Sequence, residues 1–296
     1  MSYCLARGIH LFGATLSNSV SINEPAYGSE ISITAIVAHS YNFLTAHFML
    51  FLKLSAGPIL IWSSFELFFD YLYFEHGTKY ESGLPRIFST AAFVLIWYRY
   101  YLLGEGQATY KKLYGHMRRT SVFSIRMFLL SVARMAITIV AIVIPTLGIS
   151  LYMVYSHQAG GGALTDQVIA SFVYQSIFFV GLVLSPIFVR LSFFSAAVAL
   201  GRSQTTFRHV WKKTAGYTWV LWHLTLRAFL PFALYNYLVM GQIREAIAQY
   251  DLHYFWASLL TNIPTIFIIY IMLAIVIVAN SEAFKILFGI RDGERA

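Results

Sequence analysis

Charged residues are scarce in this chain of 296 amino acids. They make up 11% of it, against about 25% in a typical soluble domain. The single cysteine, Cys4, excludes an internal disulfide and a cysteine-based metal cluster. The sequence contains no Gly-x-Ser-x-Gly element, phosphate-binding loop or dinucleotide fingerprint, and no hydrophobic segment pairs histidine with a second ligand at helical spacing. We therefore expect no catalytic residue, no metal ion and no cofactor.

Hydrophobic residues are abundant instead, at 58%, and aromatic residues reach 17%. A soluble core cannot hide so much apolar surface, so lipid must solvate much of the chain. A bilayer span needs about 20 apolar residues, and six segments meet that need. The predicted fold is all-α, an integral membrane protein with six transmembrane helices. The fourth segment contains Pro186, and we expect either a kink there or a span followed by an oblique segment. The six cover residues 54–74, 87–103, 127–155, 168–200, 217–240 and 255–280.

The distribution of lysine and arginine predicts the orientation of these spans. Basic residues gather at 106–126, at 201–213 and in the C-terminal tail, whereas the alternate connections are poor in them. Since cytoplasmic loops are the basic ones, both termini should be cytoplasmic. The same rule accounts for the net charge of +8 without nucleic acid. We expect a cytoplasmic leader at 1–31, one transmembrane domain at 32–290 and a cytoplasmic tail at 291–296.

A pattern recurs three times along the chain. A basic, aromatic-rich segment precedes a span that contains a proline, and a second span then ends in Leu-Gly or Phe-Gly. The preceding segments have the spacing of amphipathic helices among cytoplasmic headgroups, although helices packed on protein would look alike. The recurrence fits a threefold pseudo-repeat of helical hairpins, but also the periodicity of any six-span protein. The segments are 33–53, 110–126 and 205–218, the prolines Pro58, Pro145 and Pro231, and the units 32–106, 107–203 and 204–290.

Three points in the sequence carry a family resemblance: residues 97–105 (WYRYYLLGE), residues 189–192 (VRLS) followed by 199–202 (ALGR), and residues 281–285 (SEAFK). With them the chain resembles the YciC-like uncharacterised proteins of bacterial inner membranes. It is similar, more loosely, to the membrane domain of some glycerophosphodiester phosphodiesterases. Tyr98 stands where the family usually has histidine. The resemblance covers most of 32–290 and implies a six-helix protein of a bacterial inner membrane, without a defined activity.

Basic residues near the cytoplasmic face are the first candidate site. Guanidinium groups bind phosphate through a planar fork of donors. Four span arginines would hold anionic headgroups if they converge on one pocket, together with two lysines of the segment at 205–218. Each arginine could instead snorkel singly, with its stem in hydrocarbon and its head in water. The candidates are Arg99, Arg134, Arg190, Arg227, Lys212 and Lys213.

Two acidic residues inside the first span are the second candidate site. Glu66 and Asp70 stand four residues apart and so share a helical face. Charges within a bilayer are costly and usually functional, so the pair could hold a cation or relay protons. The simpler alternative places Asp70 at the interface beside Tyr71 and Tyr73, with Glu66 hydrogen-bonded inside the bundle.

These features predict a non-enzymatic accessory, assembly or scaffold protein that binds anionic phospholipid at its cytoplasmic basic residues. The alternative is a transporter with Glu66 as coupling residue in a bundle of proline-broken helices. A further alternative is an intramembrane lipid-modifying enzyme, although the spacing assembles no acid–base pair. The expected partners are the lipid bilayer, anionic phospholipids and other subunits of a membrane-protein complex, and not nucleic acid.

Overall fold

The computed structural model describes residues 31–77, 83–104, 106, 109–111, 184–202, 205–250 and 253–290. The predicted span at 127–155, the predicted helix at 110–126 beyond its first two residues, almost all of the leader, the tail and Arg134 lie outside these ranges. The regular elements described are all helical, which confirms the all-α prediction for this part of the chain. They are α1 (Ile33–Ala46), α2 (Phe48–His76), α3 (Gly83–Leu103), the helix Leu184–Ala199, α7 (Phe207–Lys213), the 3-10 turn η2 (Ala215–Tyr217), α8 (Thr218–Gln249) and α9 (Tyr254–Phe288).

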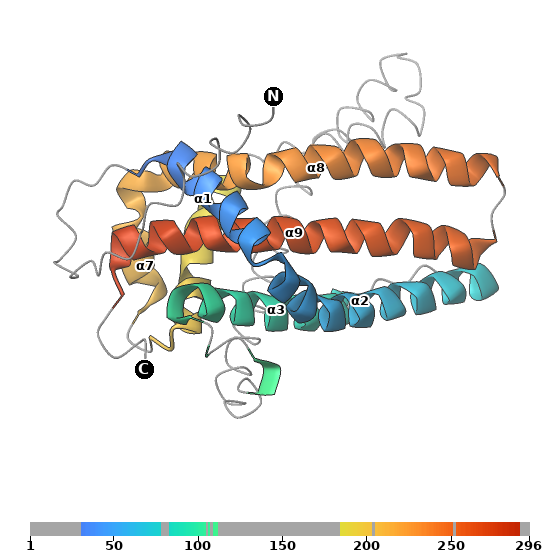
Figure 1. Cartoon of the computed structure of the whole chain (residues 1–296), viewed down its shortest axis with the longest axis horizontal. Helices are drawn as coiled ribbons and strands as arrows, with labels where there is room; N and C mark the ends of the chain where they lie inside the picture. The colour runs from blue at the N-terminus through green and yellow to red at the C-terminus, as the bar shows by residue number, and fades with distance from the viewer. Residues whose placement is uncertain are drawn as a thin grey trace, which may run out of the picture. The chain divides into compact units, whose positions relative to one another are not determined.

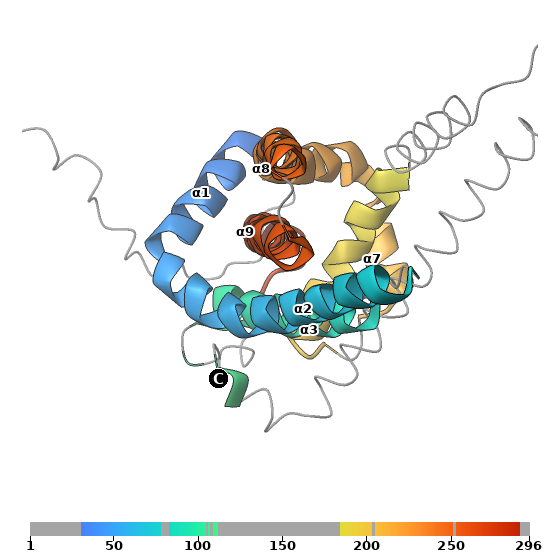
Figure 2. The same cartoon turned by 90° about the vertical axis from the view of Figure 1, so that its right-hand side faces the viewer.

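The helix α9 lies in the middle of the described helices, with α1, α8, α2 and α3 around it (Figures 1 and 2). Asp70 of α2 meets Ser258 near the start of α9, and Thr225 of α8 meets Asn280 near its end, so both neighbours run antiparallel to α9. Buried residues occupy every side of α9 from Tyr270 to Phe284. A helix that is apolar all round belongs in a core or a membrane, and α9 provides the core against which the others pack.

Two described helices are long and apolar enough to cross a membrane, by length and composition. They are α2, with 29 residues, and α9, with 35 residues, which correspond to lengths of about 44 and 52 Å. Both exceed the roughly 30 Å of a hydrocarbon core, and both contain a span predicted from the sequence. The span predicted at 87–103 falls within α3, and the span predicted at 217–240 begins one residue before α8. Residues 168–183 of the span predicted at 168–200 lie outside the described residues, and the number six stays a prediction.

The segment predicted as one amphipathic helix at 33–53 is divided at His47. This residue has a non-helical backbone, with φ −113° and ψ 26°, between the end of α1 and the start of α2. Its ring nitrogen Nδ1 bonds back to the carbonyl of Phe43 at 2.9 Å. The backbone N–H of Phe51 bonds to the carbonyl of His47 at 2.9 Å. The chain therefore changes direction at His47, and α2 begins six residues before the predicted span.

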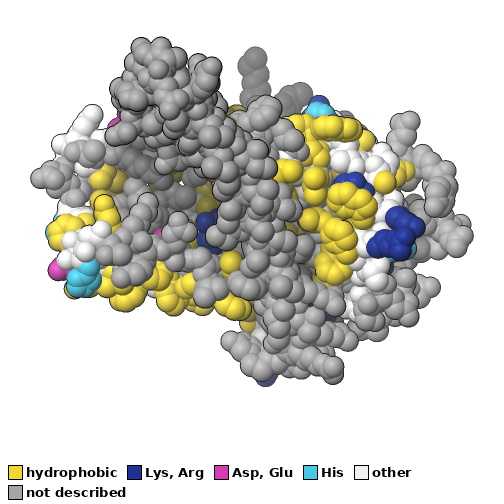
Figure 3. Space-filling model, turned by 180° about the vertical axis from the view of Figure 1, so that it is seen from behind, with side chains coloured by type: hydrophobic (Ala, Val, Ile, Leu, Met, Phe, Trp, Pro, Cys, Tyr) yellow, Lys and Arg dark blue, Asp and Glu magenta, His cyan; other side chains and the backbone are white. Residues whose placement is uncertain are grey.

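Large hydrophobic side chains are exposed along the outer faces of α2 and α8. Figure 3 shows hydrophobic side chains over much of the described surface on one face, with a group of lysine and arginine side chains at one end. Soluble monomers rarely expose contiguous apolar patches of this kind, which mark contact with lipid or protein. The exposed residues include Leu60, Ile61, Phe65, Phe68, Tyr73 and Phe74 of α2, and Leu234, Tyr235, Tyr237 and Leu238 of α8.

Four of the described helices end at a glycine with left-handed backbone, and α2 is one of them, with φ 67° at Gly77. In the other three helices the φ angles are 95° at Gly104, 77° at Gly201 and 65° at Gly289. Glycine adopts this conformation without the steric cost that a Cβ imposes, so it commonly ends helices. The latter three are the glycines of the recurring Leu-Gly and Phe-Gly elements, and their helices end on the same side of the bundle, where α7 also lies (Figure 1). We call this side the glycine end.

The first and third predicted units share an order of elements. Each has a shorter helix (α1 or α7), then a long helix with an internal proline (Pro58 or Pro231), then a helix that stops at a left-handed glycine. Of the second unit, the structure describes chiefly the closing helix Leu184–Ala199. The threefold pseudo-repeat stays a prediction.

Candidate functional site

Three arginines at the glycine end donate hydrogen bonds to carbonyl oxygens at helix C-termini. Arg99 Nη1 donates to the carbonyl of Ala199 at 3.0 Å, and Arg202 Nη2 donates to that of Gly289 at 2.6 Å. Arg190 Nη2 donates to the carbonyl of Trp211 in the last turn of α7. Terminal carbonyls lack partners within their helix and carry the negative end of the helix dipole. Each guanidinium therefore satisfies a helix end and joins it to another element.

Arg190 combines hydrogen bonds with a contact to an aromatic ring. Only 8% of it is exposed, and its Nε donates to Thr214 Oγ1 at 3.0 Å. Its guanidinium carbon lies 3.6 Å from the centroid of the Trp211 ring, within the range of a cation–π interaction. Thr214 is itself buried and donates to the carbonyl of Val210 at 2.8 Å. Arg190 thus fastens α7 to the helix Leu184–Ala199.

The span arginines proposed as one lipid site have different surroundings in the structure. Arg99 and Arg190 contact two different helix ends, whereas Arg227 is exposed on α8. Arg134 lies outside the described residues. Arg202, which is not among the residues predicted from the sequence, is the third arginine that bonds a helix end. The available signal was its position directly after Gly201, since basic residues often bond the last carbonyls of helices.

The helix α7 presents three exposed cations, Arg208, Lys212 and Lys213, which we call the α7 cation patch. Val210 is buried on the side of α7 that faces the bundle, with 2% exposed. At about 100° per residue, Arg208 and Lys212 point to the opposite side. Within the described part of the chain, no carboxylate lies within salt-bridge distance of the patch.

Aromatic side chains surround the α7 cation patch. Phe207 and Trp211 stack with ring centroids 5.9 Å apart, and the ammonium of Lys213 lies 5.1 Å from the centroid of the Phe288 ring. Thr206 caps α7 by accepting a hydrogen bond from the His209 N–H at 3.3 Å. Phe207 and Trp219 are 48% and 66% exposed. Exposed aromatic residues beside cations are typical of the membrane–water interface.

A network around Glu282 ties α9 to α3 and α1 at the glycine end. Its Oε1 accepts hydrogen bonds from the Tyr101 hydroxyl and from Lys285 Nζ, the latter at 2.8 Å. His39 of α1 bonds the Tyr101 hydroxyl at 2.8 Å. Together with the Arg99–Ala199 bond, the Tyr101–Glu282 bond brings residues of the segments 97–105, 199–202 and 281–285 to one end of the bundle.

The acidic pair in α2 has two separate sets of partners. Glu66 accepts a hydrogen bond from Trp62 Nε1 at 2.7 Å, within its own helix. Asp70 accepts from Ser258 Oγ and, at 2.9 Å, from Asn262 Nδ2, both on α9. Ser258 and Asn262 stand four residues apart on α9, so their shared face was visible in the sequence, but their contact with Asp70 across 188 and 192 positions was not.

No family model matches the chain, and no match is found among the curated proteins or the solved structures. The fold and the site define a class: an all-helical chain, in its described residues, with two helices able to cross a membrane. The assignment of a function within this class depends on the candidate site alone.

Proposed function

We propose that the chain is a multi-pass protein of a bacterial inner membrane, akin to the YciC-like proteins, and that it binds anionic phospholipid on the α7 cation patch. It acts as a non-enzymatic accessory or scaffold component of a membrane-protein complex, with its termini in the cytoplasm. The exposed apolar faces of α2 and α8 support a lipid environment. The same faces offer surface to partner subunits.

The contrast between two groups of cations carries the proposal. Arg99, Arg190 and Arg202 each donate a hydrogen bond to a backbone carbonyl of the protein. The α7 cation patch is exposed and has no carboxylate within salt-bridge distance in the described part of the chain. A helix with a buried anchor, flanking aromatic residues and outward cations suits the headgroup layer. Anionic headgroups supply the negative charge that the described residues do not place beside the patch.

A binding measurement in mild non-ionic detergent tests this proposal. The purified protein is titrated with fluorescent phosphatidylglycerol, with phosphatidylcholine as the uncharged comparison. Each basic residue near a membrane surface contributes about 1 kcal/mol, so replacing Arg208, Lys212 and Lys213 together by glutamine should weaken phosphatidylglycerol binding roughly 100-fold. The preference for phosphatidylglycerol over phosphatidylcholine should also fall with added salt, because exposed charges are screened.

Arg86→Gln is the matched control. Arg86 is an exposed cation in the first turn of α3, far from the glycine end where that helix stops. Its replacement removes one positive charge, as each of the three substitutions in α7 does, and should leave phosphatidylglycerol binding unchanged. Equal binding by the triple variant and the wild type would refute the proposal, as would an equal loss in Arg86→Gln.

A transport function is a second candidate, favoured by the hydrogen-bonded group of Asp70, Ser258 and Asn262 between α2 and α9. Pro264 lies inside α9 two residues after Asn262, and proline frees a carbonyl of its helix. Polar groups beside a membrane helix that contains a proline are a feature of transporter sites. In proteoliposomes, Asp70→Asn should then abolish solute or ion flux, whereas flux that persists in Asp70→Asn and in Glu66→Gln would exclude both carboxylates from coupling.

A further inference from the structure

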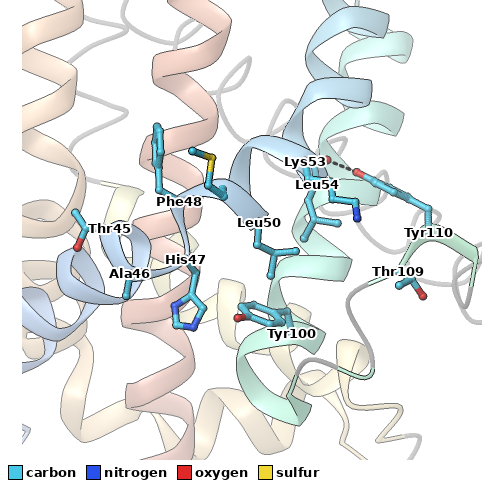
Figure 4. Close-up of a pocket in the computed structure, with 11 residues that line it drawn as sticks. Thr45, Ala46, His47, Phe48, Leu50, Lys53, Leu54, Tyr100, Thr109 and Tyr110 are labelled. Atoms are coloured by element: carbon cyan, nitrogen blue, oxygen red, sulfur yellow. Dashed lines mark hydrogen bonds between the residues drawn. The ribbon is translucent and has the colours of Figure 1, made fainter.

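A pocket of about 770 Å³ opens where α1 passes into α2 (Figure 4). Its walls come from the end of α1, the first two turns of α2, Tyr100 of α3 and the short stretch at Thr109 and Tyr110. The size is within the range of roughly 300–1,000 Å³ that holds small ligands. The α7 cation patch contributes no residue to this lining, so the pocket is a separate candidate site.

The pocket has a buried apolar floor. Leu54 and Tyr100 are only 3% and 4% exposed, and Leu50 projects between them in Figure 4. The rim includes Met49, which is 79% exposed. An apolar floor below an open rim suits a hydrocarbon chain that enters from the surface.

Lys53 is the only lysine, arginine or acidic residue among the lining residues. It is exposed, and no acidic residue in the described ranges lies within salt-bridge distance of it. Figure 4 shows its ammonium between Leu54 and Tyr110, above Thr109. The pocket therefore places one positive charge, without a counter-charge from its own lining, beside an apolar floor.

Tyr110 is held in the wall of the pocket by a hydrogen bond to an acceptor that Pro58 leaves without a helical partner. Proline has no N–H, so the carbonyl four residues earlier, that of Leu54, loses its helical partner. The Tyr110 hydroxyl donates to this carbonyl at 2.5 Å. Burial raises the pKa of Tyr110 well above its ordinary value, so the hydroxyl keeps its proton and stays a donor. Tyr110 therefore forms part of the pocket wall, and Lys53 is the cation available to bind a ligand.

We propose that this pocket binds a single acyl chain that carries an anionic head, with the chain against Leu50, Leu54 and Tyr100 and the head at Lys53. A free fatty acid and an anionic phospholipid with one chain inserted share this chemistry. Each added pair of buried methylenes should strengthen binding about tenfold until the pocket is filled. The charge at Lys53 should favour an anionic head over a neutral one of equal chain length by about fivefold.

Photolabelling of the full chain in nanodiscs of zwitterionic lipid tests the proposal. The probes are a diazirine-bearing palmitate, the corresponding hexadecanol, and a phosphatidylglycerol with the same labelled chain. Labelled peptides should include residues 45–54, with palmitate above hexadecanol. The comparison of palmitate with phosphatidylglycerol shows which source of the anionic chain the pocket prefers. Lys53→Gln should reduce palmitate labelling to the level of hexadecanol, and Lys53→Arg should retain it.

Two variants that fill the pocket from different walls guard against misfolding. Leu50→Trp and Thr109→Phe should each abolish labelling of residues 45–54 by every probe. If one of these variants elutes as an aggregate, the test uses the other. The α7 triple variant should label as the wild type does, so this result is independent of the proposed function. Labelling of 45–54 that persists in a folded filling variant, or that does not change in Lys53→Gln, would overturn the inference.

Discussion

Replacement of Arg190 by methionine separates a structural role for this arginine from a role in lipid binding. The change keeps an unbranched stem and removes the guanidinium that joins the helix Leu184–Ala199 to Trp211 and Thr214. A hydrogen bond to a charged group contributes about 1.5–3 kcal/mol, and a cation–π contact about 0.5–2 kcal/mol. With the lower values of these ranges for the two hydrogen bonds and the ring contact, we expect a loss of about 3 kcal/mol in the docking free energy of α7.

Hydrogen exchange of α7 measures this loss directly. Amides that exchange through local opening should do so about 100-fold faster when docking weakens by about 3 kcal/mol. Amides in the middle of α9 should keep their protection, since Arg190 bonds to residues that precede α8. Arg190→Lys should recover only part of the loss, because an ammonium cannot bond Thr214 and Trp211 with one planar fork and stack on the ring.

A double-mutant cycle with Thr214→Val tests the geometry further. Arg190 Nε and Thr214 Oγ1 are 3.0 Å apart, and contacting residues show coupling energies of about 0.5–3 kcal/mol. Arg190→Met together with Thr214→Val should therefore lose less stability than the two single losses combined. The reasoning is refuted if Arg190→Met leaves α7 exchange unchanged while retained anionic lipid falls. That result would make Arg190 a lipid ligand.

Three further predictions concern the thermal stability of the protein in detergent. Trp97→Phe should cost about 1–2 kcal/mol of stability, because buried Trp97 Nε1 donates to the carbonyl of Ala274 at 3.0 Å. Trp219→Phe, at a position 66% exposed, should cost almost no stability. Equal losses in the two variants would contradict this account. Asn280→Leu should cost about 1 kcal/mol, since Asn280 bonds Ser192 at 3.1 Å and Thr225 at 3.3 Å; an unchanged melting temperature would show that these bonds do not stabilise the fold. Gly289→Ala should destabilise the protein by about 1–2 kcal/mol. Its φ of 65° is strained for alanine, although no neighbour meets the added Cβ. Gly57→Ala inside α2 should be neutral or stabilising, and the opposite order would refute the argument from φ.

Much of the local structure could be predicted because its causes are local. Apolar content predicted helices at α2, α3, α8 and α9. The Leu-Gly and Phe-Gly elements marked helix ends whose glycines have φ of 95°, 77° and 65°, because a left-handed residue ends a helix through its own backbone. Helix boundaries were less exact. The division at His47 was missed, because apolar residues continue on both sides of it and only its backbone angles and its bond to Phe43 mark the turn.

The candidate sites were harder to predict because their partners are distant in sequence. Arg99 was selected for its possible affinity for phosphate, but the carbonyl it bonds belongs to Ala199, 100 positions away. For Asp70 the sequence allows either a site shared with Glu66 or a place at the membrane interface, and the structure adds Ser258 and Asn262 of α9 as donors. Tyr110 could not be linked to Pro58 from the sequence, because the proline reveals only that the carbonyl of Leu54 needs a donor.

The sequence by itself determined the helical class, the apolar character of α2 and α9 and the glycine-terminated helices, since hydrophobicity and backbone preference act within a few residues. The tertiary structure decided which polar groups meet. It brought Arg99, Arg190 and Arg202 to the ends of other helices and left Arg208, Lys212 and Lys213 exposed. The physical reason is that a buried donor must find an acceptor, and packing around α9 determines which acceptor lies within reach.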